Sequence, residues 1–372
     1  MCYNAAMRFL FLAPFGDCSK QTAPRRLLPW ARALAARGHT TLLLIPPWDC
    51  PQARPGLRMD AGVQVHTLAR GPGYAGVHPR LLPRIMRTVR AFAPDVLVGS
   101  KGLGYAGLGM AAWARRGGRV LLDVDDLEDA RGWGAQRPGW LQRALSRQEQ
   151  HLRRSAAGVV AASHFLVGDV QRSAPGQQIL YLPNGLIRAP ERARVERNAR
   201  VALLLTRGND VDAAHLARVW RWVLDQVADA RLVVVGDWSG APAGLPRVTV
   251  RGWLRCADLA QQIREAALCF FLPQDAPLLR AKSPARLLDA AAQGVPLLTL
   301  DVGAYGDLTR ALGGVVVADA EALAAQMAAL LQRPALRAQV GARVWQRAAA
   351  HSWAQRAQAF EAWLQALDAQ AR

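Results

Sequence analysis

Short apolar runs alternate with amphipathic, helix-like stretches along almost the whole chain. In the first half, apolar runs of strand length occupy residues 8–13, 41–45, 63–68, 96–98, 120–123, 159–161 and 179–182. Helical patterns lie between them at residues 24–37, 78–92 and 103–116. Repeated strand–helix–strand units predict a parallel, doubly wound sheet in an α/β fold.

The alternation stops at residues 187–200, a charged stretch that contains Pro190, and then resumes. Strands are predicted at 201–205, 231–235, 247–250, 268–272, 297–300 and 315–317, with helices near 213–226, 257–266 and 284–293 and three more at the end. We predict an N-terminal Rossmann-like domain (1–186), a linker (187–200) and a second Rossmann-like domain (201–350). The final helix, residues 351–372, is expected to pack back on the first domain, and the carboxyl edges of the two sheets to face a central cleft.

Composition excludes several classes of protein. Hydrophobic residues make up 51% of the 372 residues and charged residues 20%, which argues against disorder. No apolar run approaches the roughly 18 residues that a membrane-spanning helix needs, so a cytoplasmic protein is expected. The five Cys show no CxxC pair, which favours reduced thiols over a disulfide framework or a zinc site.

The chain is strongly basic, with 47 Lys and Arg against 28 Asp and Glu, a net charge of +19. Residues 1–186 carry +13 of this and residues 187–372 carry +6. Such an excess indicates a polyanionic partner, nucleic acid or an anionic membrane, or else only a solvated basic surface. Arg80, Arg84 and Arg87 share one face of a predicted helix whose apolar stripe should be core, and this face could rest on anionic lipid.

Cations gather before the predicted helix 284–293. Ser283 is a suitable N-cap, Pro284 suits the first helical position, and Arg280, Lys282 and Arg286 surround them. Cations oppose the positive end of a helix, but a bound phosphate would reverse that effect. The segment therefore predicts a diphosphate site, with a solvent-exposed basic loop as the alternative.

Two further features could complete such a site. Asp289, in the second turn of the same helix, could accept a sugar or ribose hydroxyl, or merely compensate Arg286. The loop 16–22 follows the first strand and contains Gly16 and Lys20; its small polar residues allow close approach to a ligand. It matches neither a P-loop nor GxGxxG.

Acidic residues cluster after the strand 120–123, and the cluster consists of Asp123, Asp125, Asp126, Glu128 and Asp129. Carboxylates at the end of a strand could orient an acceptor hydroxyl or act as a base, and we assign that role to Asp125 and Asp126. The alternative is pairing with Arg119, Arg131 or Arg137. Trp133 and Trp140 follow in a Gly-rich stretch and could stack on a sugar, enter a membrane interface, or fill the core. His39, His164 and His215 show no metal spacing and are taken as structural.

With these residues in view, the sequence resembles the GT-B glycosyltransferases, specifically glycosyltransferase family 4. The resemblance is carried by LPWARALAARGH (28–39), AGVVAASHF (157–165), LYLPNGL (180–186), LVVVGD (232–237), VRGWL (250–254) and KSPARLLDAAAQGVPLLTLDVGAYGDL (282–308). Their order and spacing cover nearly the whole chain.

The resemblance implies transfer of a sugar, with retention of anomeric configuration, from a nucleotide-diphosphate-sugar held mainly by the C-terminal domain. UDP- and GDP-sugars are favoured, and neither a metal nor another cofactor is expected. The acceptor would be a hydroxyl of a glycan, a lipid-linked molecule or a small molecule. Members often work peripherally on membranes, which suggests cell-envelope polysaccharide synthesis at the inner face of the plasma membrane.

The family's site residues carry over only in part. Its paired glutamates fall on Ala281 and Asp289, so the second is conservative and the first is lost. Its diphosphate-binding Arg matches Arg207, while its Lys has no counterpart at 211–213, and Lys282 could substitute. We place Asp125, Asp126 and Lys282 in the catalytic site.

The donor-binding set comprises Gly16, Lys20, Arg207, Trp253, Arg280, Lys282, Ser283, Pro284 and Asp289, and the acceptor or membrane set Arg80, Arg84, Arg87 and Trp133. Two other functions remain open: a catalytically degenerate sugar-nucleotide-binding scaffold, and a basic nucleic-acid-binding protein. The latter lacks a recognised nucleic-acid motif and any stretch that interleaves aromatic and basic residues.

Overall fold

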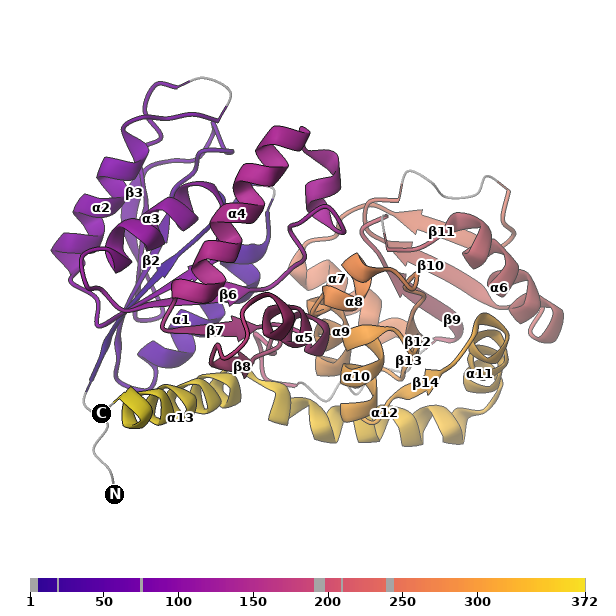
Figure 1. The fold of residues 1–372 in the computed structure, drawn as a ribbon. Coiled ribbons are helices and arrows are strands. Elements are labelled where there is room, and N and C mark those ends of the chain that lie inside the picture. The colour runs from indigo at the N-terminus through magenta and orange to yellow at the C-terminus, as the bar shows by residue number, and fades with distance from the viewer. Residues whose placement is uncertain are drawn as a thin grey trace. The chain divides into compact units, whose positions relative to one another are not determined.

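The computed structural model describes residues 6–18, 20–73, 76–190, 198–208, 210–238 and 244–371. Half of the predicted linker, residues 191–197, lies outside these ranges. The chain divides into two compact units (Figure 1). The first holds residues 1–187, 281–283 and 353–372, and the second holds 188–280 and 284–352. Among the described residues no helix is both long and apolar enough to cross a bilayer.

The first unit is built on an eight-stranded sheet in the order β3-β4-β2-β1-β5-β6-β7-β8. All neighbours are parallel except the edge pair β3–β4. Its strands are β1 (Arg8–Leu12), β2 (Thr40–Ile45), β3 (Gly56–Asp60), β4 (Val63–Thr67), β5 (Val96–Ser100), β6 (Val120–Val124), β7 (Gly158–Ala161) and β8 (Ile179–Tyr181). Its helices are α1 (Leu28–Ala35), α2 (Leu81–Phe92), α3 (Gly104–Ala114), α4 (Gly139–Ser155), α5 (His164–Ser173) and α13 (Trp353–Ala371).

Strand β1 shows how helices come to cover both faces of this sheet. Its residues alternate between the faces, as in any strand, and all but the first are buried. Phe9 and Phe11 pack in a cluster with α1 and α13 that includes Trp30 and Phe360. On the other face, Leu12 lies against Gly109 of α3. The C-terminal helix α13 thus completes the core of the first unit (Figure 1).

The second unit contains a six-stranded, all-parallel sheet in the order β11-β10-β9-β12-β13-β14. Its strands are β9 (Asn198–Leu205), β10 (Arg231–Val235), β11 (Val248–Arg251), β12 (Ala266–Phe271), β13 (Leu297–Leu300) and β14 (Val315–Val317). Its helices are α6 (Ala213–Gln226), α7 (Cys256–Glu265), α8 (Pro277–Ala281), α9 (Ala285–Ala292), α10 (Gly303–Ala311), α11 (Ala320–Gln332) and α12 (Pro334–Ala348).

The prediction of two Rossmann-like, parallel-sheet domains is confirmed. In both sheets the strand order reverses beside the first strand, between β1 and β5 and between β9 and β12. Ligands of open α/β sheets bind outside the carboxyl ends of the strands at such reversals. The loops after β1, β5 and β6, and those after β9 and β12, are therefore where each unit can hold a ligand.

Several local predictions were wrong. The first helix, expected at 24–37, begins as a π-helical turn at Ala23–Leu27 before α1, and a two-stranded edge, β3–β4, replaces a single strand. Trp140 lies in the first turn of α4, not in a loop, because the Gly-rich stretch ends at Gly139. Ser283 is not the N-cap of α9, since Pro284 occupies that position and the Ser283 hydroxyl accepts a hydrogen bond from the Asn184 N–H instead.

Candidate functional site

The loop after β1 approaches the loop after β2 closely at Gly16. The Gly16 N–H donates to Asp49 Oδ1 at 2.7 Å, and a Cβ at position 16 would lie 2.6 Å from the Cβ of Cys50. Any other residue would push the two loops apart. Lys20, four residues further on, is exposed, and its ammonium lies 5.7 Å from the Phe15 ring centroid.

The prediction that all five cysteines are reduced thiols was wrong for two of them. Cys18 and Cys50 are joined by a disulfide, since the parallel strands β1 and β2 bring residues 32 positions apart into contact. Among the described residues, the only group of His, Cys, Asp or Glu side chains close enough to share a metal is Asp17 with these two cysteines. A disulfide offers no thiolate to a metal. Cys269 is a free, buried thiol, and burial raises its pKa far above the ordinary range.

The carboxylates of the acidic cluster after β6 have different partners: some form ion pairs with arginines, and others surround a buried lysine. Asp123 is fully buried and paired with the equally buried Arg26, whose guanidinium also donates to Leu182 O and Asn184 Oδ1. Asp129 pairs with Arg131. The expected alternative of pairing with a nearby arginine therefore holds for Asp129, and for Glu128 with Arg137, whereas Asp123 pairs with Arg26, which the sequence did not suggest.

Asp125, Asp126 and Glu128 surround a single buried ammonium, that of Lys101. Its Nζ lies 3.1 Å from Asp125 Oδ1, 3.7 Å from Asp126 Oδ2 and 2.7 Å from Glu128 Oε1. Burial alone would lower the pKa of Lys101, but these carboxylates raise it well above its ordinary value. Glu128 is also paired with Arg137. Lys101 was missed because it follows β5 as an isolated residue, although it is one of only three lysines in the chain.

Asp126 is further held by Trp133, whose indole Nε1–H donates to its Oδ2 at 2.6 Å. Lys282 completes this group, with its ammonium 5.2 Å from the Trp133 ring centroid. Burial raises the pKa of the Asp126 carboxyl; Lys101 and Lys282 oppose the shift, and the like charges of its acidic neighbours add to it. The structure thus brings together four predicted site residues, Asp125, Asp126, Trp133 and Lys282, within the first unit.

The segment 281–283 is fixed to the first unit by side chains that donate hydrogen bonds to its main-chain oxygens. Ser163 Oγ donates to Ala281 O at 2.8 Å, and Asn184 Nδ2 donates to Ser283 O at 2.8 Å. The Ala281 side chain is fully buried. The position that matches the family's first glutamate is therefore occupied by a small, enclosed side chain.

In the second unit, the loop after β9 is shaped by Asp210. Its Oδ1 accepts hydrogen bonds from Thr206 Oγ1 at 2.5 Å and from the Arg207 N–H at 3.1 Å. The Gly208 N–H donates back to Thr206 Oγ1 at 2.9 Å. Gly236, at the end of β10, has φ +130°, and a Cβ there would lie 1.8 Å from Thr206 O. The two loops therefore pack main chain against main chain at the carboxyl edge of the sheet.

Arg286 fastens this loop to α9. Its guanidinium donates to Leu205 O at 2.8 Å and forms an ion pair with Asp210. Burial alone would raise the pKa of Asp210, but Arg286 and the hydrogen bonds from Thr206 and Arg207 outweigh it, and the pKa is lowered. Arg286 thus has a partner, Asp210, that the sequence did not suggest.

The remaining predicted donor residues of the second unit differ in exposure. Trp253 follows β11 and is 63% exposed, with the Arg207 guanidinium 5.8 Å from its ring centroid. Arg280 is exposed and paired with Asp275 in the segment after β12. Asp289 lies half-buried in the second turn of α9.

The basic helix α2 has the amphipathic structure that was predicted. Leu81, Ile85, Met86, Val89 and Phe92 are buried, so the apolar stripe is core. Arg80 and Arg87 are exposed, whereas Arg84 is half-buried and donates to the main-chain oxygen of Ala69. Of the three predicted arginines, two therefore face solvent in this structure.

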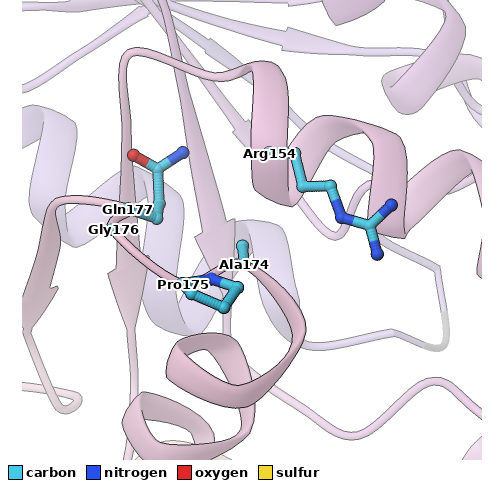
Figure 2. A pocket seen from close by; sticks show the side chains of 5 residues that line it. All are labelled: Arg154, Ala174, Pro175, Gly176 and Gln177. Atoms are coloured by element: carbon cyan, nitrogen blue, oxygen red, sulfur yellow. The ribbon is translucent and has the colours of Figure 1, made fainter.

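A surface hollow of about 300 Å³ lies at the other end of the first sheet (Figure 2). It is lined by Arg154, at the end of α4, and by the turn that joins α5 to β8, residues Ala174, Pro175, Gly176 and Gln177. Because this turn precedes β8, the hollow is at the amino edge of the sheet. It is thus separate from the carboxyl edge where the candidate site lies.

Comparisons with known proteins agree with this architecture. A family model described as glycosyl transferase 4-like domain matches residues 22–185, and one described as glycosyl transferase-like matches residues 217–362. Together they span most of the chain. A search of curated protein sequences gave no significant match.

Solved glycosyltransferases share the fold over almost their whole length. Sucrose-phosphate synthase from Thermosynechococcus elongatus superposes with a TM-score of 0.72 at 19% identity, covering 98% of this chain and 100% of that one. HepE from Anabaena, solved with UDP and glucose, gives 0.66 at 14% identity, covering 97% and 100%. WaaG, a glycosyltransferase involved in lipopolysaccharide biosynthesis, gives 0.63 at 16% identity, covering 94% and 97%. With both family models matched in order along two Rossmann-like units, the chain belongs to the GT-B glycosyltransferases of family 4.

Proposed function

We propose that this glycosyltransferase moves a sugar from a nucleotide-diphosphate-sugar to a hydroxyl group, with retention of anomeric configuration and without a metal ion. The observation that carries the proposal is the carboxyl edge of the second sheet. There the loop after β9 presents Arg207 beside the exposed ring of Trp253, next to the close main-chain contact between Gly236 and Thr206. A guanidinium suits a diphosphate, and an exposed indole suits a base.

The donor is proposed to be a UDP- or GDP-sugar. A likeness in fold to HepE, which was solved with UDP and glucose, supports a nucleotide-sugar. In the second unit, Arg280 and Asp289 would contribute to diphosphate and hydroxyl binding, together with the N–H groups at the start of α9 that follow Pro284. In the first unit, Gly16, Lys20, Lys282 and Ser283 are the proposed contributors.

The acceptor is proposed to bind the first unit beside Asp126 and Trp133. The half-buried Asp126 carboxylate can accept a hydrogen bond from a hydroxyl group, and the Trp133 ring offers a face for a sugar. Lys282, on the ring of Trp133, can stabilise the departing diphosphate. A glycan or lipid-linked acceptor, as in cell-envelope polysaccharide synthesis, is supported by the likeness to WaaG.

Nucleotide binding by the loop after β9 can be tested by calorimetry with UDP and GDP. Arg207→Ala should weaken binding of the preferred nucleotide roughly 10- to 100-fold, as expected for a lost charge-assisted hydrogen bond. Arg231→Ala is the matched control, because Arg231 is exposed at the start of β10, on the amino edge of the same sheet. Equal affinities for the two variants would contradict the proposed donor site.

Stereochemistry and metal independence need a turnover measurement. With the preferred donor and an accepted hydroxyl compound, the NMR coupling constant of the new anomeric proton should show the donor's configuration. Turnover should be unchanged by EDTA. An inverted product, or activity lost in EDTA and restored by a divalent cation, would contradict these parts of the proposal.

A further inference from the structure

Lys101 stands out among the residues that the proposed chemistry does not use. It follows β5 directly, and β5 neighbours β1 at the point where the strand order of the first sheet reverses. Its side chain is only 5% exposed. A lysine is almost never buried to this extent unless it is paired, and the reversal point is where open α/β sheets bind ligands.

The backbone at Lys101 is strained as well. Its φ of +53° lies in the left-handed region, which is unfavourable for a residue with a Cβ. The conformation is fixed by hydrogen bonds from the Lys101 N–H to Asp123 O at 2.8 Å and from the Leu103 N–H to Lys101 O at 2.6 Å. Strain of this kind persists only where the surroundings over-determine it, and it clusters at functional sites.

The strained turn directs the ammonium into the acidic cluster and away from solvent. Glu128, its nearest partner at 2.7 Å, is shared with Arg137. Asp125 and Asp126 are more exposed, with side chains 13% and 18% accessible. The ammonium is thus anchored on its buried side by Glu128 and faces the two carboxylates that lie nearest to solvent.

We propose that Lys101 is a positioning residue, whose buried ammonium holds the Asp126 carboxylate in the orientation and charge state in which it receives an acceptor hydroxyl. This inference rests on the proposed function, because it concerns the acceptor site of the same reaction. Lys101 acts through Asp126. The Trp133 indole donates a hydrogen bond at 2.6 Å to Asp126 Oδ2, the same carboxylate oxygen that lies 3.7 Å from the Lys101 ammonium.

Removing the charge of Lys101 or that of Glu128 should shift the pKa of Asp126, and the two shifts should have opposite directions. Loss of the Lys101 ammonium leaves Asp125, Asp126 and Glu128 as like charges in a buried place, so the pKa of Asp126 rises further. Loss of the Glu128 charge removes one repulsive neighbour, so the pKa of Asp126 falls. Other charged groups that the structure places near this cluster are Lys282 from segment 281–283, Arg137 on Glu128, the buried pair of Asp123 with Arg26 beside Asp125, and Glu149 with its partner Arg153 on α4.

The titration of Asp126 can be followed without any substrate. Protein labelled with 5-fluorotryptophan gives a ¹⁹F signal for Trp133, assigned by its absence in Trp133→Phe, and its shift reports the carboxylate that accepts its N–H. In Asp126→Asn the pH dependence should disappear. Lys101→Met should move the midpoint up by about one pH unit or more, Lys101→Arg should keep it close to that of the wild type, and Glu128→Gln should move it down.

Lys101→Gln, which is polar but uncharged, keeps the proposal testable if Lys101→Met does not fold, and it should also move the midpoint up. A midpoint that stays in place in a folded variant without the Lys101 charge would overturn the role of Lys101. Where turnover is measurable, the acid limb of kcat/KM should move in the same direction as the ¹⁹F midpoint. If the wild-type protein uses no sugar nucleotide, the proposed function fails, whereas the ¹⁹F experiment still decides whether Lys101 sets the state of Asp126.

Discussion

The ion pair between Asp210 and Arg286 offers a quantitative prediction about the donor-binding unit. The two side chains are 4% and 16% exposed, and the pair joins the loop after β9 to α9. In Asp210→Asn the guanidinium remains buried without its counter-ion. Breaking a buried pair in this way costs about 3–5 kcal/mol, which corresponds to a fall in local stability of roughly a hundred- to several-thousand-fold.

Hydrogen-exchange mass spectrometry measures this loss locally, which matters because a chain of two units need not unfold in one step. Peptides from β9 and α9 should lose protection by that factor in Asp210→Asn. The matched control is Asp275→Asn, which removes an exposed pair with Arg280; because water screens that pair, the substitution should leave protection nearly unchanged. Equal losses in the two variants would refute the reasoning.

The same pair makes stability depend on pH with a definite sign. The pKa of Asp210 is lowered in the folded protein, because Arg286 and the hydrogen bonds outweigh the effect of burial. The ionised Asp210 therefore contributes fully to stability above its pKa in the unfolded chain, about 3.9. This contribution is lost as the pH falls through the lower pKa of Asp210 in the folded protein. The stability advantage of the wild type over Asp210→Asn should shrink below about pH 4, and an advantage that grew there would contradict this sign.

Three further predictions concern ligand and membrane binding. Trp253→Ala should weaken UDP or GDP binding by roughly 5- to 150-fold through lost stacking and leave pyrophosphate binding unchanged; calorimetry with both ligands would expose a general loss of structure. Asp289→Ala should weaken binding of the nucleotide-sugar more than that of pyrophosphate, so equal losses would argue against a hydroxyl contact. Arg80→Gln combined with Arg87→Gln should weaken sedimentation with anionic vesicles at low salt roughly tenfold or more, at about 1 kcal/mol per charge; unchanged binding would contradict the expectation that this face of α2 rests on anionic lipid.

The sequence predicted the two parallel sheets well because buried strands of parallel sheets are continuous apolar runs. The strands β10, β13 and β14 begin and end where the pattern placed them. The edge strand β3 was missed because its residues are mostly exposed and carry no such run. The pattern of apolar residues reflects burial, so it predicts exposed edge strands least well.

The candidate site was predictable in its residue types and in two local ion pairs, Asp129 with Arg131 and Glu128 with Arg137. Its long-range pairings were not predictable, because those partners come from distant segments. Arg26 meets Asp123 across 97 positions, and Arg286 meets Asp210 across 76. Lys101 carried no motif, and its importance depends on burial and on a left-handed backbone that only the structure shows.

The central claim, that this protein transfers sugar from a nucleotide-sugar, is tested most directly by nucleoside-diphosphate release. The purified protein is incubated with UDP-, GDP-, ADP- and TDP-sugars in EDTA, and the diphosphate released is measured over time. The account predicts release from one nucleotide class, UDP or GDP, that slows markedly in Asp126→Asn and in Arg207→Ala. No release from any donor, with or without acceptor hydroxyl compounds, or release that both variants leave unchanged, would contradict it.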